Sequence, residues 1–325
     1  MGKQTLNLSS ALSFLVTCQL TLVRTLVRTH VSSVVLIASL LVSGNCRAQD
    51  LEPRSYTNVP IDLEFVAAGL VYSHGGLSPA PGVTVKDAQL TAKAAAVGYA
   101  RTFALFGQSA KFDVGTTRAC IEGSATFQGE FVEGEQCGFG DPAFKLSWNF
   151  YGAPALSLQQ WSSYKAGLVI GTSLQVEAPW GGYDSDKLLN TGTNQWVFRP
   201  GLGLSYTQEK WQYGLNATVR FYSDNDNFYN DVFLEKAPQY STQIHIIYTL
   251  DSGDWLSVSG NYFFGADTTQ DGADSNDEER NSRLGVTYSY AIDKRNSLKF
   301  NASTGFITRV GNDFSTYGVF WQYLL

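Results

Sequence analysis

The chain has 325 residues, of which 14% are aromatic and 16% are charged, whereas a typical soluble domain carries roughly 25% charged residues. Its mean hydropathy of −0.11 is too polar for a bundle of membrane helices, and its net charge of −6 excludes the basic surface that nucleic-acid binding needs. Many aromatic residues, few charges and near-neutral hydropathy favour a fold in which apolar and polar residues alternate.

Residues 1–48 predict a cleaved secretory signal peptide. They contain four basic residues and no acids, and an apolar run at 31–44 precedes the small residue Ala48. A positive start, an apolar middle and a small-residue cleavage site are the parts of such a signal. The run is shorter than the ~20 apolar residues of a spanning helix, although an uncleaved inner-membrane anchor is the alternative. Cleavage removes four positive charges and changes the net charge from −6 to −10.

Residues 49–59 are expected to form a periplasmic N-terminal segment, which together with the long loops is a candidate plug. Residues 60–325 contain no apolar run long enough to span a membrane as a helix. An exported chain of this kind enters a membrane as strands, because only helices and closed barrels satisfy their backbone groups there. The predicted fold class is therefore all-β: a single antiparallel transmembrane β-barrel of the outer-membrane type, with about twelve strands.

Strict alternation of apolar and polar residues, the signature of a strand, recurs along the chain. In one example, every second residue from Trp196 to Tyr206 is apolar. Each segment alone also suits a soluble sandwich, but lengths of ten or more residues favour a barrel, since soluble strands average about 5–6 residues. The predicted strands are 60–74, 88–106, 110–126, 131–150, 164–180, 195–207, 211–223, 238–250, 255–266, 281–292, 297–309 and 314–325.

Tight turns alternate with long polar loops between the later strands. The turns are 207–210, 251–254 and 293–296, and the loops are 179–194, 223–238 and 266–281. Outer-membrane barrels have short periplasmic turns and long extracellular loops. An even number of strands places both ends of the barrel domain, and every short turn, on the periplasmic side.

The seven tryptophans are expected at the two membrane interfaces, which aromatic side chains prefer. Trp180 and Trp196 fall at extracellular strand ends, and the other five fall at periplasmic ends or turns: Trp148, Trp161, Trp211, Trp255 and Trp321. In the closing stretch YGVFWQYLL every second residue from Tyr317 is apolar, which predicts a lipid-facing stripe that Phe320 interrupts. Gly318, Trp321 and Tyr323 resemble the C-terminal signal that the barrel-insertion machinery reads.

The face opposite the lipid face is predicted to line a cation-rich lumen. The candidates for contact with a passing solute are Glu177, Arg199, Arg220, His245, Arg283, Lys299 and Arg309. Arginines inside a low-dielectric wall repel one another unless carboxylates or an anionic ligand neutralise their charges. One interpretation is a cationic constriction that attracts carboxylates or phenolates, and the other is neutralisation by inward-folded loop acids. Examples of such acids are Asp224, Asp226, Asp267, Asp271 and Asp274.

Patterns for metal binding and catalysis are weak. After the signal the histidines are His74 and His245, which lack metal-ligand spacing. The acidic loop 271–279 lacks the EF-hand spacing and is expected to be solvated, contacting lipopolysaccharide through divalent ions. We expect no metal, no cofactor and no enzyme activity. A membrane-embedded hydrolase, which would need a Ser/His pair such as Ser241 and His245, is the third hypothesis.

Cys120 and Cys137 are the cysteines that follow the signal, and they lie symmetrically about the pair Gln128 and Gly129. A two-residue turn at that pair would place the cysteines opposite each other on adjacent strands. A disulfide between them then suits an oxidising compartment, provided that the strands adopt this register.

Several stretches resemble the outer-membrane proteins of the meta-pathway of phenol degradation, which are described as transporters. These stretches are LEPRSYTNVP (51–60), GFGDPAFKLSWNFYGAPALSL (138–158), YDSDKLLNTGTNQWVFRPGLGLS (183–205), SDNDNFY (223–229), NSRLGV (281–286) and VFWQY (319–323). The resemblance implies an outer-membrane barrel associated with the breakdown of aromatic compounds. The chain departs from that pattern at Gln195, where Arg is expected, and at Gly201, where Glu is expected.

The function that we predict is passive or facilitated uptake of small hydrophobic or aromatic compounds across the outer membrane of a Gram-negative bacterium. The expected partners are outer-membrane lipid and lipopolysaccharide, the barrel-insertion machinery and the solute, and not nucleic acid. The alternative is a surface or scaffold protein that transports nothing and binds a partner through its acidic extracellular loops.

Overall fold

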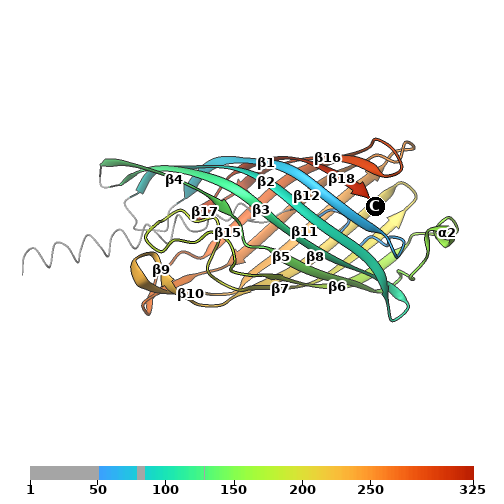
Figure 1. Ribbon diagram of the computed structural model, residues 1–325, viewed down its shortest axis with the longest axis horizontal. Coiled ribbons are helices and arrows are strands. Elements are labelled where there is room, and N and C mark those ends of the chain that lie inside the picture. Colours follow the sequence, from blue (N-terminus) through green and yellow to red (C-terminus); the bar gives the residue numbers. More distant parts are fainter. Residues whose placement is uncertain (1–50, 79–84, 128) are drawn as a thin grey trace, which may run out of the picture.

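The computed structural model describes residues 51–78, 85–127 and 129–325. Its wall strands are β1 (Glu64–Ser78), β2 (Val85–Leu105), β3 (Gln108–Phe127), β4 (Glu130–Phe139), β5 (Ala143–Tyr151), β6 (Leu168–Glu177), β7 (Val197–Gln208), β8 (Trp211–Tyr222), β11 (Gln239–Thr249), β12 (Trp255–Gly265), β15 (Glu279–Ala291), β16 (Asn296–Ile307) and β18 (Ser315–Leu324). The sheet is antiparallel and closes on itself, because β1 pairs with both β18 and β2. Since β4 and β5 share one position beside β3, these strands form a twelve-stranded barrel (Figure 1), as predicted.

Side chains alternate between the outer surface and the lumen along each wall strand. In β7, Phe198, Leu202 and Tyr206 are exposed on the outer surface, whereas Gly203 and Ser205 between them are buried. The polypeptide backbone of a strand imposes this period of two. The apolar stripes identified in the sequence are therefore the outer face of the barrel.

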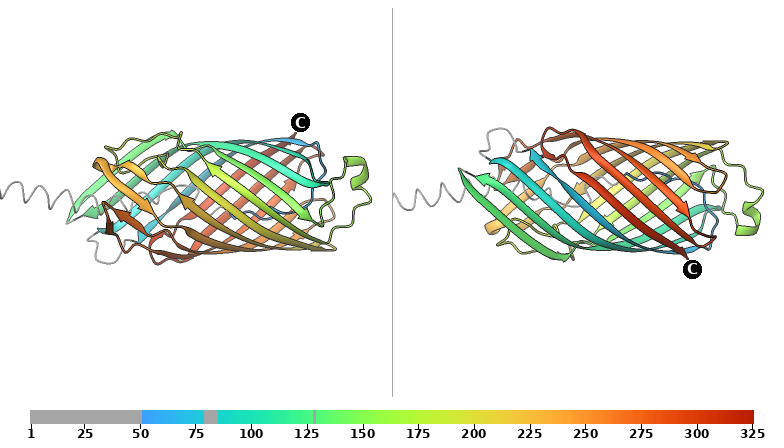
Figure 2. Two further views of the ribbon diagram at one scale, coloured as in Figure 1. Left: turned by 90° about the horizontal axis from the view of Figure 1, so that it is seen from below. Right: turned by 90° about the horizontal axis from the view of Figure 1, so that it is seen from above.

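The two ends of the barrel differ. The short β7–β8, β11–β12 and β15–β16 turns lie at the end that carries the C-terminus and helix α2 (Leu158–Trp161) (Figures 1 and 2). The opposite end carries the tip of β4 and a separate four-stranded sheet. The elements of that end are β9 (Asn225–Phe228), the 3-10 turn η1 (Tyr229–Asp231), β10 (Val232–Lys236), β13 (Thr268–Gln270), β14 (Ala273–Asp274) and β17 (Gly311–Asn312). Short turns and long connections therefore separate as predicted.

The fourth predicted strand, 131–150, is broken in two. Strand β4 ends at Phe139 and β5 begins at Ala143. The break falls on Gly140, Asp141 and Pro142, where the proline has no N–H to donate to a ladder. Both halves pair with β3, so β4 continues beside β3 above the wall while β5 continues within it.

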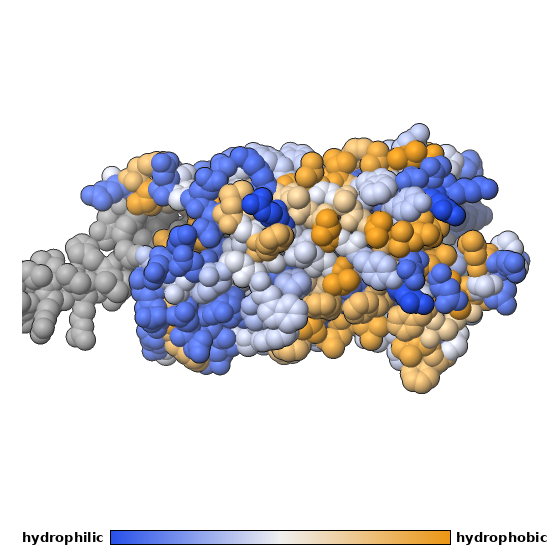
Figure 3. Space-filling model, viewed as in Figure 1, coloured by the Kyte–Doolittle hydropathy of each residue, from blue (hydrophilic) through white to orange (hydrophobic). Residues whose placement is uncertain are grey.

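The outer surface carries an apolar band. Apolar residues gather over the half of the barrel nearest the C-terminus, and the opposite end is mainly hydrophilic (Figure 3). Among the described residues no helix is long and apolar enough to cross a membrane. A closed sheet satisfies the backbone groups of its strands without water, and an apolar outer band on such a barrel is the surface that meets lipid. The protein is an outer-membrane β-barrel.

Trp255 lies at the predicted periplasmic end, as do Trp211 and Trp321, but unlike them it does not face outward. Trp180 and Trp196 are exposed at the extracellular side, and Trp211 and Trp321 are exposed at the periplasmic side. Trp255, however, is 8% exposed and points into the lumen. The alternation along β12 explains this difference. Trp255 shares a face with the buried residues at 257, 259 and 261, opposite the apolar residues at 256 and 258.

The closing stripe faces outward, as expected from its alternation. Tyr317, Val319 and Trp321 are exposed, and Phe320 between them lines the lumen. A side chain at Gly69 or Gly318 would collide with the Phe320 ring, so these two glycines leave the space that the ring occupies. The role of Gly318, Trp321 and Tyr323 in insertion remains a prediction.

Candidate functional site in the barrel lumen

Residues 51–63 run through the lumen. Tyr56 and Asn58 are 4% and 3% exposed. At the periplasmic end Thr102 of β2 fixes the segment, because its hydroxyl donates to Pro60 O at 2.8 Å and accepts from Leu63 N–H at 3.0 Å. The sequence suggests either a periplasmic position or a plug for residues 49–59. In the structure the described part, 51–59, lies inside the barrel, and we call residues 51–63 the plug segment.

Glu52 is the charged anchor of the plug segment. Its carboxylate forms ion pairs with Lys145 of β5 and, at 2.7 Å, with Arg199 of β7. Its N–H donates to Gln243 Oε1 on β11 at 3.1 Å, so this one residue contacts three strands of the wall. Burial alone would raise the pKa of Glu52, but the charges and hydrogen bonds of Lys145 and Arg199 lower it well below its usual range.

Tyr56 is the apolar anchor. Its hydroxyl lies 3.0 Å from Ser173 Oγ on β6. A Cβ at Gly171 or Gly203 would collide with the Tyr56 ring, and one at Gly201 would lie 3.3 Å from its hydroxyl. These three glycines and Ser173 form the Tyr56 socket. Gly201, one of the departures from the resembling family, is therefore part of the surface against which the plug segment rests.

Further along the lumen, charges occur in pairs. Arg220 of β8 lies 3.7 Å from Glu177 at the end of β6, and Lys236 of β10 lies 4.0 Å from Glu279 of β15. These pairs decide between the two interpretations of the upper lumen. Lys145, Arg199, Arg220 and Lys236 each pair with a carboxylate, so the open cationic constriction is wrong. Neutralisation by acids is confirmed in part: Glu279 comes from the predicted loop 266–281, whereas Glu52 and Glu177 come from the plug segment and β6.

Arg283 and Arg309 have structural roles. Arg283 is 4% exposed, and its guanidinium donates to Phe314 O at 2.7 Å and Ser303 Oγ at 3.2 Å, which ties β15 to the start of β18. Arg309 follows the end of β16 and pairs with Glu278 at 2.8 Å, with a side chain 44% exposed. Arg309 is therefore at the extracellular rim and not in the lumen, because β16 ends two residues earlier than predicted.

His245 is a buried link between strands. It is 1% exposed, its Nδ1 lies 2.8 Å from Ser259 Oγ and its Nε2 lies 3.2 Å from Asn216 Nδ2. Through these two contacts the imidazole joins β8, β11 and β12. Ser241, the serine suggested by the sequence, instead donates to Asn261.

A cavity of about 780 Å³ remains between the plug segment and the wall. Its upper part reaches Glu177 and Arg220, and its lower part reaches Lys299, Trp255 and Lys111. Lys299 is thus the sequence-predicted lumen residue that lies toward the periplasmic end. Charged and apolar side chains are both present in the lining, so the cavity offers a surface for solutes that are only partly polar.

Cys120 and Cys137 form a disulfide between β3 and β4. The strands pair these two residues directly, and the pairing continues to Phe127 opposite Glu130. Strand β4 lies above the break at 140–142, so the disulfide joins the hairpin that rises from the wall rather than the wall itself (Figure 1).

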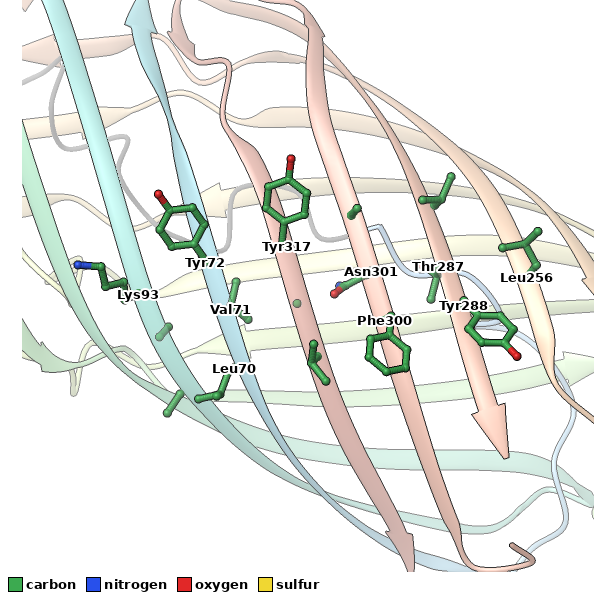
Figure 4. A pocket seen from close by; sticks show the side chains of 16 residues that line it. Leu70, Val71, Tyr72, Lys93, Leu256, Thr287, Tyr288, Phe300, Asn301 and Tyr317 are labelled. Atoms are coloured by element: carbon green, nitrogen blue, oxygen red, sulfur yellow. The ribbon is translucent and has the colours of Figure 1, made fainter. Parts of the chain in front are cut away.

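A second hollow, of about 810 Å³, lies on the outer wall across β1, β2, β12, β15, β16 and β18. Tyr72, Phe300 and Tyr288 project from these strands around it (Figure 4). The lining is apolar, as expected for a surface that contacts acyl chains. Both the outer hollow and the lumen cavity are lined by Val71, Ala94, Thr287 and Asn301.

A family model described as "Putative MetA-pathway of phenol degradation" matches residues 73–323. The chain belongs to this family. Its fold is similar to that of an outer-membrane channel from Pseudomonas putida F1, at 18% identity and a TM-score of 0.72, covering 85% of this chain and 100% of that one. It is also similar to the transport unit of the autotransporter AIDA-I from Escherichia coli, at 12% identity and a TM-score of 0.52, covering 88% and 97%. A search of curated proteins found no significant match.

Several stretches that carry the resemblance to the phenol-degradation family meet at the extracellular end. The Asp141 carboxylate accepts hydrogen bonds from the N–H of Gly181 and from the N–H and hydroxyl of Thr193, each at 2.8 Å. Asn225 accepts from Asn194 Nδ2, also at 2.8 Å. These residues hold the long loop after β6 against the break between β4 and β5, so their contribution to the family pattern is structural.

Three residues of the lumen site, Glu52, Tyr56 and Lys145, are not in the sequence-predicted set. Glu52 and Tyr56 precede the first strand, where no alternation marks a face, and the resembling stretch 51–60 is the signal that could have indicated them. Lys145 shares its parity with the buried residues Ser147 and Asn149, so its inward direction can be read once β5 is recognised as a strand of its own.

Proposed function

We propose that the protein is an outer-membrane channel for small hydrophobic and aromatic compounds, and that the plug segment limits passage through it. The observation that carries this proposal is the cavity of about 780 Å³ between the plug segment and the wall. Barrels of about eight strands are filled by their own side chains. Twelve strands leave interior space, and here a polypeptide segment occupies part of it.

The lining of the cavity supports the solute class. Val71, Phe320 and Trp255 contribute apolar and aromatic surface to the same cavity that the paired charges of the upper lumen line. The family description names phenol degradation, and the similar structure from Pseudomonas putida F1 is called an outer-membrane channel. A phenolic compound combines one apolar ring with few polar groups, which suits a mixed lining of this kind.

The way the plug segment is held supports passive passage. Its contacts to the strands include an ion-pair cluster at Glu52, a socket for Tyr56 and single hydrogen bonds such as Gln212 Nε2 to Thr57 Oγ1 at 2.6 Å. Net contributions of such bonds are about 0.5–3 kcal/mol each. Displacement of the upper part of the segment is therefore within reach of thermal motion, while Thr102 keeps the lower part attached to β2.

The test is entry of a hydrophobic aromatic dye into cells whose lipopolysaccharide excludes it. 1-N-phenylnaphthylamine becomes fluorescent when it reaches the lipid beneath the outer leaflet. Cells that display the folded protein should take up the dye severalfold faster than cells with an empty vector. The Arg283→Ala variant, which loosens the contact between β15 and the start of β18 and leaves Glu52 and Tyr56 unchanged, controls for general leakiness.

The result that would reject the proposal is equal uptake with and without folded protein in the outer membrane. Conductance that is absent from planar bilayers even after removal of the plug segment would reject it as well. Either result would favour the alternative of a surface or scaffold protein.

A further inference from the structure

Two cations at the periplasmic end of the cavity share one aromatic ring. The Arg54 guanidinium carbon lies 5.5 Å from the centroid of the Trp255 ring, and Lys299 Nζ lies 5.8 Å from the same centroid. Arg54 belongs to the plug segment and Lys299 to β16. All three residues line the cavity, together with Lys111 of β3.

These cations differ from those of the upper lumen. Lys145, Arg199 and Arg220 each have a carboxylate partner. Within residues 51–78, 85–127 and 129–325, no carboxylate lies within ion-pair distance of Arg54 or Lys299, and burial lowers the pKa of Arg54. Asp113 pairs with Lys111 at 3.0 Å, so the group retains two positive charges more than negative ones.

Electrostatics and shape both indicate which kind of ligand would bind beside these cations. Like charges in a low-dielectric lumen repel one another, and a bound anion offsets the repulsion between Arg54 and Lys299. A planar guanidinium binds a carboxylate through two parallel hydrogen bonds. The indole of Trp255 stabilises the cations through its π face while the group is empty and offers an apolar surface to a ligand ring.

We propose that Arg54, Lys299 and Trp255 form a binding site for a small aromatic carboxylate, with Lys111 adding positive charge. The carboxylate lies between the guanidinium and the ammonium group, and the aromatic ring lies against the indole. The site rests on the proposed channel function and narrows its solute class to aromatic acids. Because Arg54 is on the plug segment, such a ligand also contacts the element that limits passage.

Equilibrium dialysis of radiolabelled benzoate against the folded, full-length protein purified from outer membranes tests the site at physiological salt. Arg54→Gln changes no residue of a wall strand, so we expect the barrel to form. Lys299→Gln tests the wall partner. The matched control is Lys210→Gln, which removes one positive charge at the same end but from an exposed turn, where Lys210 pairs with Asp251.

We expect the Arg54→Gln and Lys299→Gln variants to bind benzoate about tenfold more weakly than the wild type, which corresponds to about 1.4 kcal/mol. Lys210→Gln should bind like the wild type, and acetate should compete much more weakly than benzoate. Equal benzoate affinity in Arg54→Gln and Lys210→Gln, or a wild-type protein that binds no benzoate, would overturn the site. Competition by acetate as strong as that by benzoate would show that the ligand ring makes no favourable contact with the Trp255 indole.

Binding and passage are separate readouts. A wild type that admits the neutral dye but does not bind benzoate refutes the site and leaves the channel function standing. A wild type that binds benzoate through Arg54 but admits no dye refutes the channel function and leaves the site standing.

Discussion

Glu52 and Arg199 lie 147 positions apart in the chain, yet Arg199 Nη2 donates to Glu52 Oε1 at 2.7 Å inside the barrel. This contact joins the plug segment to β7, and Lys145 of β5 pairs with the same carboxylate. The plug segment is therefore held by a charge cluster that forms only when the segment before the first strand lies inside the finished barrel.

Replacing Glu52 with Gln should release the upper part of the plug segment. The variant keeps the size of the side chain but leaves Lys145 and Arg199 without a counter-charge, at a cost of about 2 kcal/mol for a charged hydrogen-bonded contact. Single-channel recordings in planar bilayers should show open events far more often than in the wild type. Glu209→Gln, at an exposed turn, is the control, and an unchanged open probability would contradict the anchor role of Glu52.

The wild-type plug segment should stay in place over the pH range of most experiments. Lys145 and Arg199 lower the pKa of Glu52 well below its ordinary value of 4.5. A carboxylate with a lowered pKa stabilises the folded arrangement fully above the ordinary value and loses that contribution as pH falls through the lowered one. Open probability should therefore be constant from pH 8 to pH 5 and rise only in much stronger acid. A rise centred between pH 5 and 7 would show that another group controls the plug segment.

Substitution in the Tyr56 socket should also open the lumen. A Cβ at Gly203 would occupy the position of the Tyr56 ring, so Gly203→Val should expel the ring and increase conductance. Gly260→Ala is a matched strand substitution, because its Cβ would make only an ordinary contact, 3.6 Å from Leu284 Cδ2. If both variants conducted like the wild type, Tyr56 would not help to hold the segment.

The disulfide should stabilise the extracellular hairpin and not the barrel. Cys120 and Cys137 are 17 positions apart, and closing a loop of this size contributes about 3 kcal/mol. After reduction, proteolysis should cut the β3–β4 tip faster, while heat-modifiable migration of the barrel on gels remains. In the denatured wild-type protein, a thiol reagent should label no cysteine before reduction, and labelling at that stage would show that the bond does not form.

The wall of the barrel could be predicted because its rule is local. Alternation determines which residues face lipid. Because Leu256 and Val258 face lipid, the same rule directs Trp255 into the lumen. Its assignment to the lipid interface relied on its position near a turn and not on its place in the alternation. The break between β4 and β5 was also readable, since Gly140 and Pro142 are both residues that interrupt strands.

The lumen could not be predicted in the same way. Alternation identifies Arg199 and Arg220 as inward-facing but does not say which carboxylate reaches each of them. The partners Glu52 and Glu177 come from distant parts of the chain, and their positions depend on the path of the plug segment and the register of the closed sheet. Ion pairing in the lumen thus depends on the tertiary structure. It makes the upper lumen a set of ion pairs instead of an open cationic constriction.

Deletion of residues 51–59, with the signal peptide and Pro60 retained, tests most directly whether the plug segment closes the lumen. The barrel should still fold, because its strands begin at Glu64, and folding can be checked by heat-modifiable migration. Single-channel conductance of this variant should be severalfold larger than that of the wild type and steady rather than intermittent. A folded deletion variant with the same conductance as the wild type would show that the N-terminal segment does not close the channel.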